Sequence, residues 1–428
     1  MKHTLFIPIA CAAMLAPAAA QDAPAAAYEQ GALLNAADLL PAGMLRGTSH
    51  RVREQVATDG FMAHFEIDTD FGTFDAVGVP QAKSRIVEAD AIRKLVETSK
   101  GDLFAEGLKR SINQPIDAVK NIVKDPVRAA KQAPKTVGHF FSKIGTSIQR
   151  GAERAGEQIH EASTGEVDSG TAASQAGRGI GEAAKNAAGF DKARLDTAKQ
   201  LGVDPYSDNA RLQEEIDKVT WAFFAGGLPL RIGAAVASAG VAVAATNMVG
   251  IPDDTYALTQ AELTLRDAKS LSAMGVSEAD IKAFQLSRIL STTRRHRIVT
   301  SLADLSHARG RGDIVQLASS CSTAGQADFL IGALAILVER QRGGAADYVA
   351  LSVLGRLPGA TTAAGALEVP APVDHVTWTG QVADFAKRDD LGTAPKMLVH
   401  TGTLSPATTA GFAAAGWQTL GVAYPHGR

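Results

Sequence analysis

FMAHFEIDTDFGTFDAVG, residues 61–78, carries the clearest strand pattern in the N-terminal part of this chain. Apolar and polar residues alternate through 61–67 and again through 72–78, which is typical of strands with one buried face. Asp70-Phe71-Gly72 is a turn signal between the two segments. A second turn signal, Asp59-Gly60, separates them from an earlier alternating segment near residues 52–57. The sequence therefore predicts a three-stranded antiparallel β-meander.

The rest of the chain has helical periodicity up to about residue 357 and a mixed pattern beyond it. Apolar residues at helical spacing predict helices over 84–98, 212–224 and 328–342, with further short helices between 260 and 357. Beyond residue 370, strands at 376–379, 397–400 and 419–423 alternate with helices at 381–387 and 406–415. This order favours a small parallel β-α-β-α-β unit. We therefore expect an α+β fold with an N-terminal antiparallel β-meander, a mainly helical middle and this C-terminal unit.

The first twenty residues have the layout of a secretory signal peptide. Lys2 and His3 precede an apolar run that ends near Leu15, and Ala18 and Ala20 supply the small residues of a cleavage site. We therefore expect the protein to be exported to the periplasm or outer envelope, with cleavage after residue 20. Only Cys321 remains in the mature chain, so no internal disulfide can form and the exported protein must be stabilised by its cores.

Composition divides the remaining chain into segments. After the signal peptide at 1–20 we expect a flexible segment at 21–47, the β-meander plus helix at 48–100, basic amphipathic helices at 101–161, a linker at 162–190, a helical bundle at 191–360 and the small α/β unit at 370–428. Within the bundle, 232–251 is an uncharged Ala/Gly-rich run long enough to span a bilayer. Alanine and glycine offer little apolar surface, so we expect a buried helix, with membrane insertion as the alternative.

The basic amphipathic helices carry the main functional hypothesis. Between residues 116 and 154, eight basic side chains face only three acidic ones: Lys120, Lys124, Arg128, Lys131, Lys135, Lys143, Arg150 and Arg154. Apolar residues lie on the opposite face, which suits an anionic lipid surface or an envelope protein as partner. The alternative is an ordinary helix packed on the protein with its lysines in water. The net charge of −2 for the whole chain gives no reason to expect nucleic acid.

Two further groups of residues are candidates for an anion or small ligand. The first is a basic cluster at a helix start, where an anion would offset charges that oppose the helix dipole: Arg294, Arg295, His296 and Arg297. The second lies where strands of the C-terminal unit end and helices begin: Thr379, Gly380, Thr401, Gly402 and Ser405. The alternatives are a solvated basic face for the first group and turn and cap chemistry for the second.

Weaker patterns complete the survey. Asp68, Asp70, Gly72 and Asp75 faintly resemble a calcium loop, but a hairpin turn explains them without a metal. Cys321 could act as a nucleophile with His296 or His307 only if folding brought them together. No stretch carries a specific catalytic, metal or cofactor signature, so we expect no cofactor and no metal.

Four stretches resemble uncharacterised secreted proteobacterial proteins of no assigned function: DGFMAHFEID at 59–68, VGHFFSKIG at 137–145, LGVDPYSDN at 201–209 and SPATTAGFAAAGW at 405–417. This resemblance implies a common architecture and no particular activity. Our hypothesis is an exported, non-enzymatic envelope protein that associates with a membrane surface or protein partner through its basic helices. The alternative is a periplasmic enzyme or small-ligand-binding protein with its site at the C-terminal strand ends.

Overall fold

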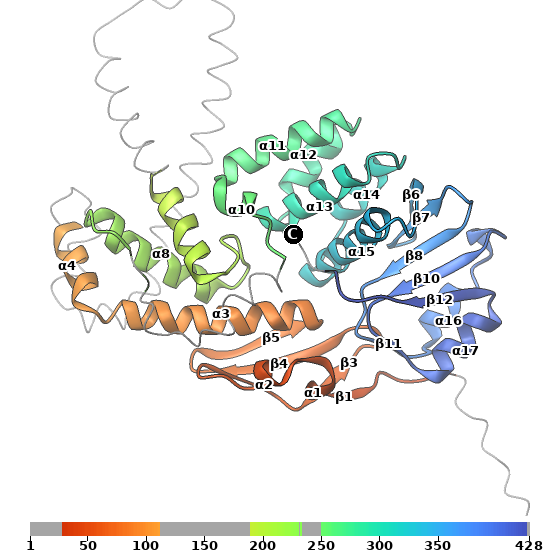
Figure 1. The fold of residues 1–428 in the computed structure, drawn as a ribbon, viewed down its shortest axis with the longest axis horizontal. Helices are drawn as coiled ribbons and strands as arrows, with labels where there is room; N and C mark the ends of the chain where they lie inside the picture. The colour runs from red at the N-terminus through yellow and green to blue at the C-terminus, as the bar shows by residue number, and fades with distance from the viewer. Residues whose placement is uncertain (1–27, 112–188, 231, 233–249, 426–428) are drawn as a thin grey trace, which may run out of the picture.

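The computed structural model describes residues 28–111, 189–230, 232 and 250–425. The expected signal peptide, the basic side chains at 120–154, the linker at 162–188 and most of the apolar run at 232–251 therefore lie outside the described residues. Among those it does describe, the order of elements is an antiparallel sheet, a helical middle and a mixed C-terminal sheet (Figure 1), which confirms the α+β fold class.

The N-terminal sheet is built around β4 (Ala63–Thr69). Along one edge β4 pairs with β3 (Gln55–Thr58) and β2 (His50–Val52), and along the other with β5 (Gly72–Val77), all antiparallel. Phe65 and Ile67 are buried while His64 and Glu66 are exposed, as the alternation in the sequence predicts. The predicted three-stranded meander is thus confirmed as β3–β4–β5, and α3 (Val79–Thr98) packs on this sheet.

Residues 28–47 differ from the expected flexible segment. They form β1 (Leu33–Asn35), which pairs with β3, and the short helices α1 (Ala36–Leu39) and α2 (Ala42–Leu45). Ala36, Leu40 and Met44 follow at spacings of four and are buried in the same core as Phe65. Elements of three or four residues are too short to give a periodic signal, so the Ala-rich composition concealed them.

The helical middle has two cores. The first joins α3 to α4 (Asp102–Ser111), a helix over 189–201 and α8 (Ala210–Ala225). The second contains five helices that precede the C-terminal sheet: α11 (Gln260–Ala273), α12 (Glu278–Leu286), α13 (Thr292–Asp304), α14 (Arg311–Ser319) and α15 (Ala324–Arg342). A short helix, α10 (Asp254–Ala257), links the two. No helix in the described part of the chain is long and apolar enough to cross a membrane.

The C-terminal sheet corrects two expectations. Its order is β12-β10-β8-β7-β6, and the parallel strands are β8 (Leu367–Ala371), β10 (Lys396–His400) and β12 (Trp417–Gly421). The first strand of the parallel unit is therefore β8, and the segment expected at 376–379 yields only β9 (His375–Val376), which pairs with β11 (Thr403–Leu404). The hairpin of β6 (Tyr348–Leu354) and β7 (Leu357–Thr362) occupies chain that we expected to be helical. The expected connecting helices are α16 (Gly380–Ala386) and α17 (Pro406–Ala414), and η2 (Asp389–Leu391) follows α16.

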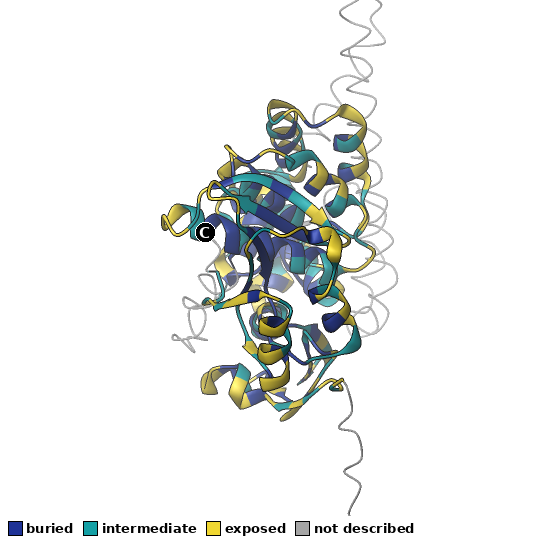
Figure 2. Cartoon of the chain, turned by 90° about the vertical axis from the view of Figure 1, so that its right-hand side faces the viewer, coloured by how far each residue is buried: buried dark blue, intermediate teal, exposed yellow. Residues whose placement is uncertain are grey.

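Polar contacts join segments near the two ends of the chain. The Asp374 carboxylate accepts hydrogen bonds from the backbone N–H of Ala63 at 2.9 Å and of Val79 at 3.2 Å. Glu29 accepts one from the backbone N–H of Trp378 at 2.6 Å and another from the Ser405 hydroxyl at 2.5 Å. Figure 2 shows buried residues along the C-terminal sheet and the helices against it, with exposed residues on the outer helices.

Candidate functional site

Four described helices begin around one polar cavity of about 210 Å³. Its wall includes residues of the first turns of α3, α13 and α15, together with the two residues before the N-cap of α8: Val79, Pro80, Gln81, Thr293, Arg294, Gly325, Asp328, Ser207 and Asp208. The N-terminal end of a helix carries a partial positive charge. The polar cavity is therefore surrounded by positive helix ends as well as by charged side chains.

Local sequence explains why the helices start here. The N-caps of α8, α13 and α15 are Asn209, Ser291 and Thr323. Each side chain accepts a hydrogen bond from the backbone N–H three residues later. The start of α3 is set differently, by Gly78 at φ 86° followed by Pro80 in the first turn. Gln81 then accepts the backbone N–H of Val77 at 2.7 Å, which ties the end of β5 to the helix.

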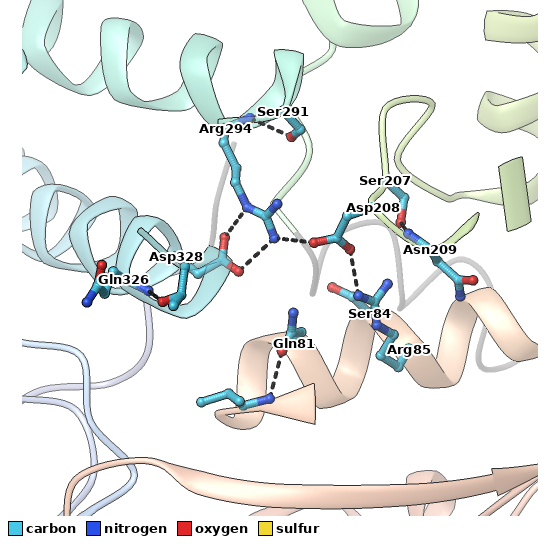
Figure 3. A network of polar contacts seen from close by, with 12 residues as sticks. Gln81, Ser84, Arg85, Ser207, Asp208, Asn209, Ser291, Arg294, Gln326 and Asp328 are labelled. Carbon is cyan, nitrogen blue, oxygen red and sulfur yellow. Dashed lines mark hydrogen bonds and ion pairs between the residues drawn. The ribbon is translucent and has the colours of Figure 1, made fainter. Parts of the chain in front are cut away.

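A chain of alternating charges crosses the polar cavity (Figure 3). Arg85 of α3 donates to Asp208 at 2.6 Å, and Arg294 of α13 donates to the other oxygen of Asp208 at 2.9 Å. Arg294 also makes a two-point contact with Asp328 of α15, at 2.8 Å and 2.9 Å. Two arginines and two aspartates thus join three helices and the loop before a fourth.

The electrostatics of this chain follow from its geometry. Burial disfavours the charged form of Asp208, but Arg294 and Arg85 outweigh it and hold the pKa of that carboxyl below its ordinary value. Burial likewise disfavours the Arg294 cation, while Asp328 and Asp208 raise its pKa. Asp208 and Arg294 are therefore charged at neutral pH.

Two further carboxylates lie beside this chain. Glu88 is buried and accepts from Arg85 at 2.8 Å, from the Ser207 hydroxyl at 2.5 Å and from the Asn209 amide at 2.8 Å. Asp204 accepts from the Thr293 hydroxyl at 2.5 Å and from the backbone N–H of Tyr206. Burial raises the pKa of Asp204 to about 6, because these two donors and the more distant Arg294 offset only part of the desolvation.

A larger apolar cavity of about 670 Å³ adjoins the polar one. Its wall is formed by the N-terminal sheet with its turn, by α14 and α15, and by the C-terminal sheet with α16 and α17. Representative wall residues are Phe61, Phe329, Val369, Phe385 and Phe412. The two cavities share Met62, Val77, Gly325 and Phe329 as wall residues. The polar side chains of the apolar cavity include Arg356 and the pair formed by Asp59 and His64, 3.2 Å apart.

The basic cluster predicted on α13 does not act as one group. Arg294 is bound to carboxylates, and Arg295 donates to the backbone carbonyls of Gln285 and Ser287 at 3.0 Å and 3.3 Å. His296 is buried, with its Nδ1 2.8 Å from Asp267. Arg297 lines the polar cavity. The four side chains therefore have different surroundings, because successive residues of a helix point in different directions, and anion binding by this cluster stays a prediction.

The second predicted group serves as caps and turns. Thr379 and Ser405 accept the backbone N–H groups of Val382 and Thr408, and the Thr401 hydroxyl donates to the carbonyl of Val373 at 2.8 Å. Any Cβ on Gly402 would lie 2.1 Å from the Asp374 carbonyl oxygen, so glycine is needed there for close backbone approach, while Gly380 opens α16. None of these five residues lines either of the two cavities, and neither His296 nor His307 does.

The structure also shows the surroundings of Cys321 and of the acidic residues near Asp68. Cys321 lines the apolar cavity, where burial raises the pKa of its thiol; its sulfur lies 3.7 Å from the Leu317 carbonyl, and no described histidine is bonded to it. Asp68 is paired with Arg53 at 3.0 Å and accepts from Thr73, in a hairpin turn. Within the described ranges, no group of three or more His, Cys, Asp or Glu side chains could hold a metal ion.

Sequence reasoning missed most of the polar cavity. Arg85, Glu88 and Asp328 come from distant helices, and nothing in their local sequence distinguishes them from surface charges. One signal was available, because LGVDPYSDN at 201–209 contains Asp204, Ser207, Asp208 and Asn209. Comparison of the chain with protein-family models, with curated proteins and with solved structures finds no match.

Proposed function

We propose that this protein is an exported binding protein that holds an apolar small molecule in the apolar cavity. The observation that carries the proposal is the cavity itself, whose volume of about 670 Å³ lies in the range of small-molecule sites. Three separate parts of the fold build its wall, so it is a feature of the assembled molecule and not of one loop. The signal-like segment at 1–20 supports export to the periplasm or outer envelope.

The wall defines the class of ligand. Aromatic rings from three helices and the turn before β4 line this cavity, and the rest of its lining is mostly aliphatic: Phe61, Phe329, Phe385 and Phe412 are joined by Leu330, Val369, Val376, Val382 and Leu398. Burial of apolar surface contributes roughly 25 cal/mol per Å², so an acyl chain or a ring system gains most here. The few polar side chains would orient such a molecule without competing for its apolar body.

Binding of an uncharged fluorescent probe, N-phenyl-1-naphthylamine, to the mature chain tests the proposal. We expect saturable binding at one site with enhanced emission. Leu317→Trp places a larger side chain in the cavity wall and should weaken the probe at least tenfold. Leu265→Trp is the matched control, because Leu265 is 57% exposed on α11, away from both cavities. Thermal unfolding of both variants without probe verifies that they fold.

Two results would refute this proposal. One is the absence of saturable binding by the wild-type chain. The other is Leu317→Trp with unchanged probe affinity and an intact unfolding transition, because the probe would then bind elsewhere.

A second candidate function rests on the charge pattern at 116–154, where eight bases face three acids. Association of this segment with an anionic lipid surface would place the binding protein where apolar molecules are exchanged. Each base near such a surface contributes about 1 kcal/mol, and salt screens the attraction. Flotation of the mature chain with anionic vesicles should fall when Lys135, Lys143, Arg150 and Arg154 are all replaced by Gln. Equal flotation with neutral vesicles, or none with either, would contradict it.

A further inference from the structure

The polar cavity contains two cations that the charge chain does not use. Arg85 and Arg294 are bound to Glu88, Asp208 and Asp328. Lys83 of α3 and Arg297 of α13 also line the cavity, and in the described part of the chain neither side chain makes a hydrogen bond or an ion pair within 4 Å. Both side chains are only partly exposed. An ammonium and a guanidinium therefore line one cavity without a directly bound carboxylate among the described residues, although Asp328 and Asp204 attract the guanidinium from a greater distance.

The surroundings of these two cations disfavour their charge. Burial lowers the pKa of Lys83, and no neighbouring carboxylate offsets it. Burial also lowers the pKa of Arg297, even though Asp328 and Asp204 attract it. Because arginine stays protonated in proteins, its charge must be balanced by something other than loss of a proton. An anion bound between the two side chains would supply that balance.

The net charge around the polar cavity, helix N-termini included, favours an anion. The side chains alone are balanced, because four acids lie against four bases: Glu88, Asp204, Asp208 and Asp328 against Lys83, Arg85, Arg294 and Arg297. The N-termini of α3, α8, α13 and α15 then add roughly half a positive charge each. A neutral donor is also available, because the Ser291 hydroxyl accepts the backbone N–H of Arg294 and keeps its own hydrogen (Figure 3).

We propose that the polar cavity is a binding site for a phosphate group, held by the Arg297 guanidinium and the Lys83 ammonium. Two cations suit a phosphate, whose charge approaches −2 at neutral pH, and the planar guanidinium can donate two parallel hydrogen bonds to its oxygens. A volume of about 210 Å³ admits the group, whether it is free or part of a small monoester. This site is independent of the apolar ligand proposed above.

Isothermal titration of the mature protein with inorganic phosphate, at ionic strength fixed with sodium chloride, tests the site. We expect one site per chain in the wild type and at least a tenfold loss of affinity in Lys83→Gln/Arg297→Gln. The matched control is Lys282→Gln/Arg309→Gln, which removes the same two residue types from exposed positions that line neither cavity. A parallel titration with glycerol 1-phosphate shows whether the natural ligand is free phosphate or a small phosphate monoester. If glycerol 1-phosphate binds more tightly than inorganic phosphate, the ligand is a monoester. If it binds equally or more weakly, the ligand is free phosphate.

Thermal unfolding distinguishes a loss of phosphate affinity from a loss of folding in the double variant. Neither the Lys83 nor the Arg297 side chain has a hydrogen-bonded partner among the described residues to lose, and both are desolvated, so the double variant should unfold at about the same temperature as wild type or higher when phosphate is absent. Added phosphate should raise the unfolding temperature of wild type and control only. The proposal is overturned if the wild type shows no heat beyond that of a chloride titration, or if the cavity variant binds phosphate as tightly as the control. A variant that unfolds well below wild type without phosphate would also contradict it, because the two cations would then have a structural role.

Discussion

Arg294 on α13 and Asp328 on α15 form a two-point contact, with Nε 2.8 Å from Oδ1 and Nη2 2.9 Å from Oδ2. The same guanidinium also reaches Asp208, in the loop before α8. One side chain therefore fixes the relative positions of three segments that are far apart in sequence. The geometry depends on the planar guanidinium, because a lysine ammonium is a point charge at the end of a flexible chain.

Arg294→Lys should consequently destabilise the protein by about 1–2 kcal/mol, because one of the two carboxylates loses its contact with this side chain, and both carboxylates are about one-third exposed to screening solvent. Urea unfolding followed by circular dichroism measures the change. Arg266→Lys is the control: Arg266 pairs with Asp254 at 2.7 Å, but both side chains are about half exposed, so the expected change is below about 1 kcal/mol. Equal losses in the two variants would contradict the structural importance of the Arg294 contact.

Asp204 should give the protein a specific pH dependence. Its pKa is about 6 in the folded protein against an ordinary value of 3.8, so the folded state binds the proton more tightly than the unfolded state. Stability contributed by this group is therefore lost as the pH rises from about 4 to about 6, by up to about 3 kcal/mol.

Asp204→Asn removes the titration while keeping an oxygen that can accept from Thr293. The difference in unfolding free energy between variant and wild type should move in favour of the variant as the pH rises from 4 to 7. Urea unfolding at closely spaced pH values measures this difference. Asp384→Asn, at an exposed position on α16, should run parallel to wild type. If the unfolding free energies of Asp204→Asn and wild type changed in parallel with pH, the pKa of Asp204 would not be raised in the folded protein.

Asp374 should be a strong determinant of stability, because it accepts two backbone N–H groups of the N-terminal half and the Tyr424 hydroxyl. Asp374→Ala leaves those buried donors without a partner and should cost about 3 kcal/mol or more in urea unfolding. Tyr424→Phe, which removes only one donor, should cost about 1 kcal/mol. If both variants lost the same small amount, the link between the two sheets would not depend on this carboxylate.

Substitution of Gly78 should destabilise the protein, because two unfavourable effects add to the free energy of the folded state. Its φ of 86° is strained for any residue with a side chain, and a Cβ there would lie 2.6 Å from Cε of Met62. Gly78→Ala should therefore destabilise by about 1–3 kcal/mol in thermal or urea unfolding. Gly43→Ala, in α2 with no atom within 4 Å of the added Cβ, should be neutral or slightly stabilising. Similar effects at both positions would argue against the tight packing at Met62.

How far the sequence predicts the fold depends on whether the signal is local. Strands β4 and β5 carry alternation and a turn within eighteen residues. Ser277, Ser291 and Ser405 are residue types that favour helix starts, and each is an N-cap in the structure. Strand β8 gives no such pattern, because all five of its residues are buried. Its Glu368 looks like a surface residue until Arg340, from α15, is found against it at 2.7 Å.

The candidate site was less predictable for the same reason. Arg85 and Asp208 are 123 residues apart, and Arg294 and Asp328 are 34 apart. Each looks like an ordinary helix-surface charge in its own segment, and only the packing of α3, α13 and α15 brings them together. The apolar cavity had no sequence signal at all, since its wall residues are the same types that fill a core.

The contacts between Glu29 and Ser405 have a consequence for how the protein is made. These residues are separated by 376 positions, and Asp374 is 311 positions from Ala63. Contacts of such long range form late, because a large loop must close before they stabilise anything. The N-terminal sheet therefore cannot acquire its full set of partners until nearly the whole polypeptide has been synthesised. A chain that completes its native contacts so late would suit the export proposed above, because a polypeptide can pass a narrow channel only before it has folded.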